Sequence, residues 1–424
     1  MPLKNIYLTA TLIAAVHYST FAAESRIETS ATTPANSAVA VLAPAPALAP
    51  GGVDVDAGVV YQNGLYASAA GYLCLGKVCF PCQKSYVLDV CKMSCRFPVK
   101  AAIQDHAAPL VVVLLGITGS PDEDFSKLWA SWYADAGYHV LAFQSTFVQE
   151  FNQRSQHGVC GNMWAETDLV VNIINAFLHQ TPVEGQVTKI GIAGMSYGAV
   201  EALMLGTMAG PDAKKKLPFE IAAIQAYSPP IRIEQSARIV DGWYAQTYGK
   251  YTLVQLLQLL KYKPDPATFE SEVPEDMLKC AIATSFRLSL PSLIAYSDSN
   301  YHLHKLPKGD EFTDRYVRED YASRWSFIKF AYGMSYPYWQ EKLNMPSLEP
   351  LVKTAELPAL FAKQPAYSEV ILAEDDPLNS TEDSASFKAF AAGKRITVLK
   401  HGGHLGYISQ RWTRKKLMTL FDPK

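Results

Sequence analysis

From residue 97 onward, short apolar runs alternate with segments in which apolar residues recur at helical spacing. The run at 110–115, Leu-Val-Val-Val-Leu-Leu, is apolar at every position, as expected for a strand buried on both faces of a sheet. The alternation predicts an α/β fold with a mostly parallel sheet and helices on both faces. The predicted strands are 97–104, 110–115, 138–143, 187–193, 221–226, 368–373 and 395–400, and the predicted helices are 122–136, 165–179, 199–208, 252–260, 387–392 and 410–421.

The alternation stops at about residue 231 and returns at residue 368. The block at 231–350 contains helical stretches, several prolines and many aromatic residues. It is therefore predicted to be a large helical cap inserted late in the sheet of a domain that spans 97–424.

The chain begins with a segment typical of secretory signal peptides. Lys4 precedes a mostly apolar stretch at 6–21, and Ala22 provides a small residue at the expected cleavage point. A membrane anchor is the other interpretation, but the stretch is interrupted by polar residues and is short for a span of about 20 residues. We expect residues 1–22 to direct export to the periplasm or the cell exterior, and residues 23–57, rich in Ala, Pro, Thr and Ser, to be an extended linker rather than a core element.

Residues 58–96 form a Cys-, Gly- and Tyr-rich block, predicted to be an N-terminal extension held against the next domain. In an exported protein such a cluster is predicted to form disulfides, whereas zinc binding is the alternative for a cytosolic one. Connectivity does not follow from spacing. The chain has seven cysteines, so at least one is left unpaired within the chain: Cys74, Cys79, Cys82, Cys91, Cys95, Cys160 and Cys280.

The bulk composition restricts the classes of function. Hydrophobic residues make up 49% of the chain, which supports a large buried core, and charged residues 18%. The formal net charge is −2, and no basic run is longer than three residues, so a nucleic-acid partner is not expected.

Ser196 lies at the centre of Gly194-Met195-Ser196-Tyr197-Gly198, between a predicted strand and a predicted helix. A strand–elbow–helix turn presents a serine hydroxyl clear of the sheet, in a strained backbone geometry. Side chains at the flanking glycines are expected to collide with the neighbouring helix and strand. Ser196 is therefore the predicted nucleophile, and an inert turn is the alternative.

A serine nucleophile needs a base, and the base needs a carboxylate that fixes its tautomer. His404 follows the last predicted strand in His401-Gly402-Gly403-His404, where the two glycines let the chain turn back over the sheet edge. Asp376 follows the strand at 368–373, and Pro377 keeps it out of helical geometry. The order Ser, Asp, His matches the order the elbow requires.

The alternatives to these two residues are His401 for the base and Asp375 for the acid, with Glu374 predicted to be a solvated loop charge. His302 and His304 lie in the insertion, out of the expected order, and are predicted to be surface or cap residues.

Donors to a developing oxyanion are expected at two backbone N–H groups. One belongs to Tyr197, directly after the nucleophile, and the other to Ile117, in the loop after the strand at 110–115. Gly116 and Gly119 permit a close backbone approach in that loop, and an ordinary turn is the alternative.

These motifs resemble those of the α/β-hydrolase superfamily over residues 97–424, in particular a bacterial, esterase-like branch of serine hydrolases. The resemblance is carried by Gly194–Gly198, Asp375-Asp376-Pro377 and Gly402-Gly403-His404, with support from the Ser-Pro-Pro turn at Ser228–Pro230 and the segment at 151–164. It implies an α/β-hydrolase fold with a large cap. Leu115-Gly116 departs from the family's usual His-Gly before the oxyanion loop.

The hypothesis that follows is ester hydrolysis through an acyl-enzyme, without cofactor or metal. The expected substrate is a small-molecule or lipid-like ester, and contact with a membrane surface is a further expectation. Cleavage of amides or peptides by the same residues is a second hypothesis. A non-catalytic binding protein on a hydrolase scaffold is the third. The cap contains many aromatic residues, which are expected to lie mostly in the core. Any of them that face the cleft are expected to bind an apolar acyl chain. These aromatic residues are Trp243, Tyr244, Tyr248, Tyr251, Trp325, Phe327, Phe330, Tyr336, Tyr338 and Trp339.

Overall fold

The computed structural model of the chain describes residues 53–55, 57–91, 95–210, 216–310, 313–390 and 395–421. The predicted signal peptide at 1–22 and most of the predicted linker at 23–57 lie outside the described residues.

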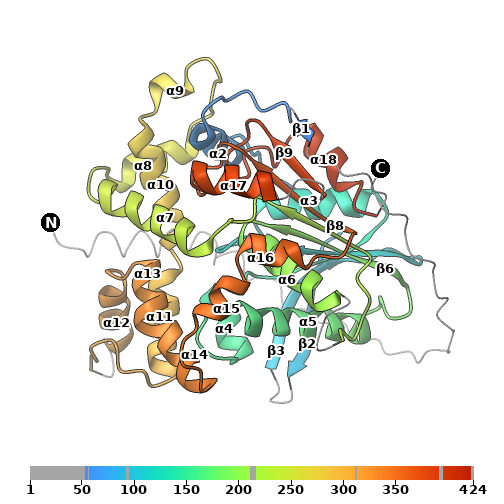
Figure 1. Cartoon of the computed structure of the whole chain (residues 1–424), viewed down its shortest axis with the longest axis horizontal. Coiled ribbons are helices and arrows are strands. Elements are labelled where there is room, and N and C mark those ends of the chain that lie inside the picture. The colour runs from blue at the N-terminus through green and yellow to red at the C-terminus, as the bar shows by residue number, and fades with distance from the viewer. Residues whose placement is uncertain are drawn as a thin grey trace.

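A sheet forms the centre of the described part of the chain (Figure 1). Its nine strands run in the order β1-β9-β8-β7-β6-β4-β5-β3-β2. All neighbours pair in parallel except at β3, which is antiparallel to both β2 and β5. The predicted mostly parallel sheet is confirmed. The strands are β1 (Val53–Val55), β2 (Lys84–Cys91), β3 (Cys95–Ala102), β4 (Ala108–Leu114), β5 (His139–Ala142), β6 (Val187–Met195), β7 (Ala223–Tyr227), β8 (Ser368–Ala373) and β9 (Ile396–Leu399).

Helices cover both faces of this sheet, and β4 shows why its sequence is uniformly apolar. Leu110 and Val112 pack into the core beneath α5 and α6, whereas Val111 and Val113 pack into the core beneath α3 and α18. Each face of the strand therefore meets a hydrophobic layer, as predicted from the run at 110–115. The helices of the two layers are α3 (Asp124–Asp135), α4 (Gln149–Ser155), α5 (Met163–Gln180), α6 (Tyr197–Ala209), α17 (Thr381–Phe390) and α18 (Arg411–Leu417).

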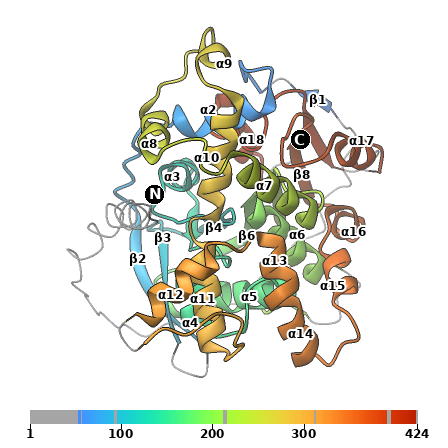
Figure 2. The ribbon, with the colours of Figure 1, turned by 90° about the vertical axis from the view of Figure 1, so that its left-hand side faces the viewer.

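A helical segment lies between β7 and β8, where the cap was predicted, and forms the side of the molecule that faces the viewer in Figure 2. It continues past the predicted end at residue 350. The stretch Glu275–Asn300 could cross a membrane by length and composition alone, but Leu278, Leu293 and Ile294 are buried within the protein. The cap helices are α7 (Ile233–Thr247), α8 (Leu253–Lys261), α9 (Phe269–Glu272), α10 (Glu275–Arg287), α11 (Leu290–Asn300), α12 (Asp314–Ala322), α13 (Phe327–Phe330), the π-helix η1 (Ala331–Ser335), α14 (Tyr336–Lys342), α15 (Glu349–Thr354) and α16 (Leu357–Ala362).

The N-terminal extension is part of the main fold, which differs from its prediction as a separate block. Helix α2 (Gly64–Leu73) is buried along most of its length, β2 is an edge strand of the sheet, and the boundary expected at residue 97 falls inside β3. The predicted linker also ends in a strand, because Val53–Val55 pairs with β9. These segments were missed because their place in the fold depends on distant partners.

The predicted disulfides find no support among the cysteines whose side chains are described. Cys74, Cys79 and Cys82 are free and exposed, and Cys160 and Cys280 are free and buried. The side chains of the remaining two cysteines lie outside the described residues. No group of three or more His, Cys, Asp or Glu side chains within the described ranges is arranged to hold a metal ion.

Candidate active site

Ser196 occupies a sharp turn between β6 and α6, with φ +54° and ψ −118°. Its backbone N–H donates to the carbonyl oxygen of Tyr227 on β7 at 2.8 Å. A Cβ on Gly194 would lie 2.2 Å from the carbonyl oxygen of Gly198, and a Cβ on Gly198 would lie 2.5 Å from that of Leu114. The collisions predicted for the flanking positions are therefore present in the structure, and only glycine fits at both.

The structure brings Ser196, His404 and Asp376 into one chain of hydrogen bonds. Nε2 of His404 lies 2.8 Å from Oγ of Ser196, and Nδ1 lies 2.8 Å from Oδ2 of Asp376. The exposed fractions of the three residues are 8%, 4% and 2% in the order Ser196, His404, Asp376. With the Nδ1 proton donated to the carboxylate, Nε2 is free to accept the proton of the serine hydroxyl.

Each partner of Ser196 is fixed by its own loop. The second carboxylate oxygen of Asp376, Oδ1, accepts the backbone N–H of Leu378 at 2.9 Å, which holds the acid just past the end of β8. His404 lies between two residues of positive φ, Gly403 at +54° and Leu405 at +63°. This turn brings the imidazole back over the sheet, as the pair of glycines predicted.

The loop after β4 approaches Ser196 closely. A Cβ on Gly116 would lie 3.5 Å from Cβ of Ser196, and Ile117 lines the same cavity as Ser196. Tyr197 is the first residue of α6, so its backbone N–H has no acceptor one turn earlier in the helix. Both predicted donor residues thus lie beside the nucleophile.

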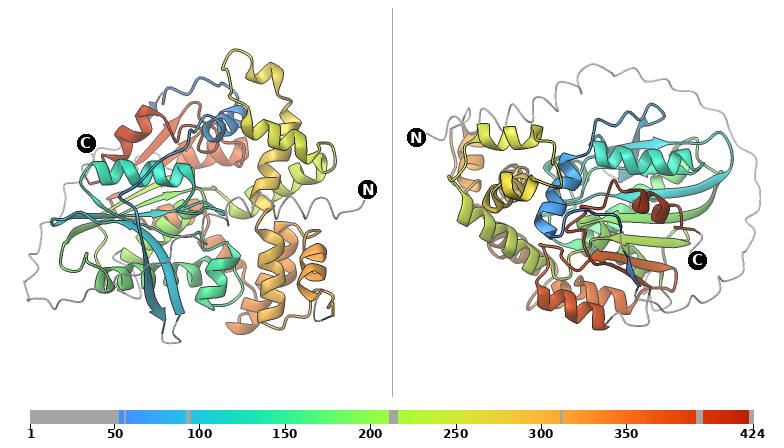
Figure 3. Two further views of the ribbon diagram at one scale, coloured as in Figure 1. Left: turned by 180° about the vertical axis from the view of Figure 1, so that it is seen from behind. Right: turned by 90° about the horizontal axis from the view of Figure 1, so that it is seen from above.

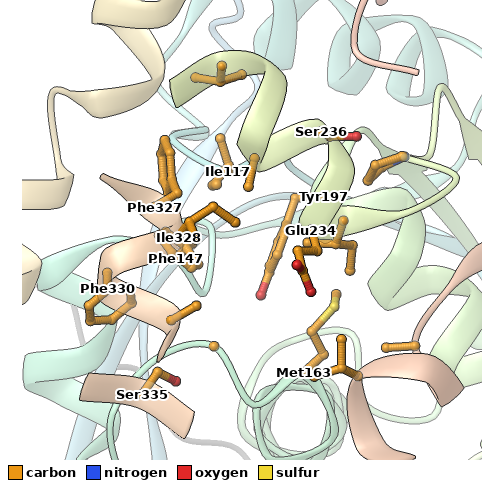
Figure 4. Close-up of a pocket in the computed structure, with 18 of the residues that line it drawn as sticks. Ile117, Phe147, Met163, Tyr197, Glu234, Ser236, Phe327, Ile328, Phe330 and Ser335 are labelled. Carbon is orange, nitrogen blue, oxygen red and sulfur yellow. The ribbon is translucent and has the colours of Figure 1, made fainter. Parts of the chain in front are cut away.

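A largely apolar cavity opens onto Ser196 and His404, between the sheet domain and the cap (Figure 4). Its volume is about 160 Å³, far above the roughly 10–15 Å³ that one water needs, so several carbon atoms fit. Of the predicted cap aromatics, Phe327, Phe330 and Tyr336 line the cavity, whereas Trp325 and Trp339 are buried elsewhere. The wall is completed by residues that sequence reasoning did not single out, among them Phe147, Met163, Trp164, Ile233, Phe286 and Ile328.

A buried acidic network lies behind Tyr197 and was also missed. The Tyr197 hydroxyl donates to Oε2 of Glu166 at 2.6 Å, and the backbone N–H of Gly161 donates to Oε1 at 2.6 Å. Oγ1 of Thr146 lies 2.6 Å from Oε1 of Glu201 and 3.0 Å from Oε2 of Glu166. Because Gly161 and Tyr197 both line the cavity, the network fixes part of its wall.

Burial raises the pKa of Glu201 to about 8, with the hydrogen bond to Thr146 opposing the shift and the negative charge of Glu166 adding to it. Glu201 therefore carries its proton at neutral pH. The protonated carboxyl can donate to Thr146, whose hydroxyl then donates to Glu166, so that each polar group of this trio has a partner.

The alternatives weighed in the sequence lie elsewhere. His401 faces Asp375, with Nδ1 and Oδ2 3.8 Å apart, and not Ser196. Asp375 accepts the backbone N–H of Gly403 through Oδ1 at 2.8 Å, and burial raises its pKa. The side chains of His302 and His304 are exposed on the cap.

No family model matches the chain, and no curated protein matches it. The fold is similar to that of Est1E from Butyrivibrio proteoclasticus, at 12% identity over 80% of this chain and 96% of that chain, with a TM-score of 0.39. It is also similar to the esterase Pf2001 of Pyrococcus furiosus, at 12% identity over 80% and 89%, with a TM-score of 0.43. A membrane phospholipase A, described as a bacterial virulence factor, gives 13% identity over 84% and 89%, with a TM-score of 0.41.

The class of fold follows from the chain itself. The sheet is mostly parallel, with helices on both faces, and it carries a serine on a strand-to-helix elbow. An acid and a histidine follow the serine in that order and complete its hydrogen-bonded chain. These features fit the α/β-hydrolase fold.

We expect the stability of the protein to fall as the pH rises from about 5 to 8, in part through Glu201. Unfolded glutamate loses its proton near its ordinary pKa of 4.5, whereas burial raises the pKa of Glu201 in the folded state to about 8, so the stabilisation present at low pH is lost across this window. Replacing Glu201 by Gln should flatten this part of the dependence, measured as the free energy of unfolding in urea at several pH values. Glu220→Gln, at an exposed position, is the control, and an unchanged slope in Glu201→Gln would contradict the assignment.

Proposed function

We propose that the protein is a serine hydrolase that cleaves carboxylic esters through an acyl-enzyme. The observation that carries this proposal is the hydrogen-bonded chain Asp376–His404–Ser196 at the wall of an apolar cavity. Neither the hydrogen-bonded chain nor the cavity would support the proposal alone, because hydrogen-bonded polar side chains also stabilise folds and apolar cavities also occur in binding proteins.

In the first half of the reaction, Oγ of Ser196 forms a bond to the ester carbonyl carbon while its proton passes to Nε2 of His404. Asp376 keeps the imidazole in the required tautomer and stabilises its positive form. The tetrahedral intermediate then collapses, the bond to the alcohol oxygen breaks, and His404 returns the proton to the leaving alcohol. Water repeats the sequence on the acyl-enzyme and releases the carboxylic acid.

The negative charge on the carbonyl oxygen requires donors at the point where it develops. The backbone N–H groups of Ile117 and Tyr197 are the proposed pair. The short approach of Gly116 to Ser196 supports Ile117, and the helix N-terminus at Tyr197 supports the second donor, since the positive end of a helix favours an anion.

The substrate is proposed to carry an apolar acyl chain. The cavity wall at the nucleophile is made chiefly of aliphatic and aromatic side chains, with the polar groups of Ser196 and His404 at one point on it. Figure 4 shows Phe147, Phe327, Ile328 and Phe330 gathered on one side of this space, opposite Met163 and Tyr197. Such a surface favours methylene groups over water.

A fluorophosphonate probe tests the nucleophile and the base. We expect the wild-type protein to be labelled at Ser196, and Ser196→Ala to lose both labelling and ester turnover by about 10⁴-fold or more. His404→Ala should lose turnover to a similar degree, whereas His401→Ala, two glycines away, should retain it. An unlabelled wild type would refute the enzyme assignment in favour of a binding protein, and faster turnover of matched amides than of esters would favour the peptidase hypothesis.

Acyl-chain length tests the cavity. Each buried methylene contributes about 0.8 kcal/mol, which is about fourfold in kcat/KM, so butanoyl p-nitrophenyl ester should be cleaved about tenfold or more faster than the acetyl ester. Ala237→Phe should abolish this preference, because Ala237 lines the cavity. Ala245→Phe, exposed on the same helix α7, is the matched control. Equal kcat/KM for the two esters would contradict the apolar acyl site.

Export of the chain is proposed from the sequence alone, on the strength of Lys4 and the apolar stretch at 6–21. We expect the exported protein to begin after Ala22, which N-terminal sequencing of the secreted form would detect. An unprocessed chain retained in the cytoplasm would contradict this proposal.

A further inference from the structure

Helix α2 of the N-terminal extension lies against both loops that carry the partners of Ser196. It sits between the cap and the sheet, as the view from above in Figure 3 shows, where α2 is blue and the cap helices nearest to it, α7 to α10, are yellow-green to yellow. The acid loop contacts its first turn at Asp375, and the histidine loop runs along it from Gly403 to Gly406. Neither contact is expected from the motifs that identify the site.

Ser68 makes the polar contact between α2 and the histidine itself. The backbone N–H of His404 donates to Oγ of Ser68 at 2.7 Å, and the Ser68 hydroxyl donates to the carbonyl oxygen of Gly64 at 2.6 Å. The hydroxyl is therefore used as both donor and acceptor, and its orientation is fixed. Ser68 and His404 are each only 4% exposed, so the hydrogen bond between them is shielded from solvent.

Backbone contacts hold the same elements in register. A Cβ on Gly64 would lie 1.7 Å from the carbonyl oxygen of Asp375, next to the acid of the site. A Cβ on Gly403 would lie 2.0 Å from the carbonyl oxygen of Gly64, and one on Gly71 would lie 2.7 Å from Cα of Gly406. These contacts leave room for glycine only, and they bring the backbone of α2 directly against the backbone of the two loops.

The opposite side of α2 is anchored in the cap. The Tyr66 hydroxyl donates to the carbonyl oxygen of Val273 at 2.8 Å, and the Tyr66 ring packs edge to face on Phe269 with centroids 5.3 Å apart. The helix is thus held from both sides, and Ser68 presents its hydroxyl to His404 from a helix that contacts the cap on one side and the histidine loop on the other.

We propose that Ser68 is a positioning residue that fixes the backbone of His404, and that α2 is thereby part of the active site; this inference rests on the proposed function. Ser68 does not line the substrate cavity, so it acts on the proton-transferring imidazole and not on substrate binding. A displacement of about 1 Å at a catalytic group can lower a rate about 100-fold. The effect of losing the Ser68 hydroxyl should therefore appear in kcat.

The test compares Ser68→Ala with Ser126→Ala in steady-state kinetics on a p-nitrophenyl ester. Ser126, on α3, is also buried, at 1% exposed, and its hydroxyl has no hydrogen-bond partner within the described residues, so its removal controls for the loss of a buried oxygen. We expect Ser68→Ala to lower kcat about 10- to 100-fold with KM within about twofold of the wild type, and Ser126→Ala to leave both unchanged. A kcat of Ser68→Ala within about twofold of the wild type, or an equal loss in both variants, overturns the proposal.

Amide hydrogen exchange of His404 in the wild-type protein tests the contact without a variant. The His404 amide should exchange slowly, because it is buried and bonded to Ser68. Exchange as fast as that of His302, on an exposed loop of the cap, overturns the inference even if Ser68→Ala fails to fold. A wild type without ester turnover or labelling at Ser196 refutes the proposed function instead, since the exchange measurement does not depend on catalysis.

Discussion

The strained backbone of Ser196 is the constraint on which the rest of the site depends. A non-glycine residue at φ +54° and ψ −118° costs of order 1–3 kcal/mol, and it persists only where the surroundings determine it. Here two features hold Ser196 in this conformation. Its N–H donates a hydrogen bond to Tyr227, and Gly194 and Gly198 lie in close contact with the neighbouring backbone. Because the turn is fixed, the direction in which the Ser196 hydroxyl points is also fixed. The loops that carry His404 and Asp376 must therefore place their side chains on that side of the serine.

The sheet brings the three loops that carry Ser196, Asp376 and His404 together. β6, β8 and β9 are parallel, so the residues that follow them lie at the same edge although they are far apart in the chain. Open α/β sheets carry their ligands at this edge because the loops there converge. Ser196, Asp376 and His404 follow these three strands, and α2 adds Ser68 to the same edge from the N-terminal side of the domain.

The sequence was sufficient for elements whose signal is local. The strand at β8 was predicted with its observed bounds, and the apolar run at 110–115 identified the central strand β4. The three polar residues of the site were predicted because their motifs are bounded by such elements. Helix α2 was missed because it is buried nearly all round and so lacks an amphipathic pattern. Its sequence, Gly-Leu-Tyr-Ala-Ser-Ala-Ala-Gly-Tyr-Leu, is rich in small residues and does not indicate a helix by apolar spacing.

Contacts that join distant residues could not be predicted, and they decide how the site is supported. Nothing in the sequence near Glu201 indicates that Thr146 and Glu166 lie beside it, and nothing near Ser68 indicates His404. A buried carboxyl or hydroxyl must find partners from wherever the fold brings them, since an unpaired polar group is costly. The motifs therefore identify the reacting groups, whereas the precision with which those groups are held comes from residues that no motif contains.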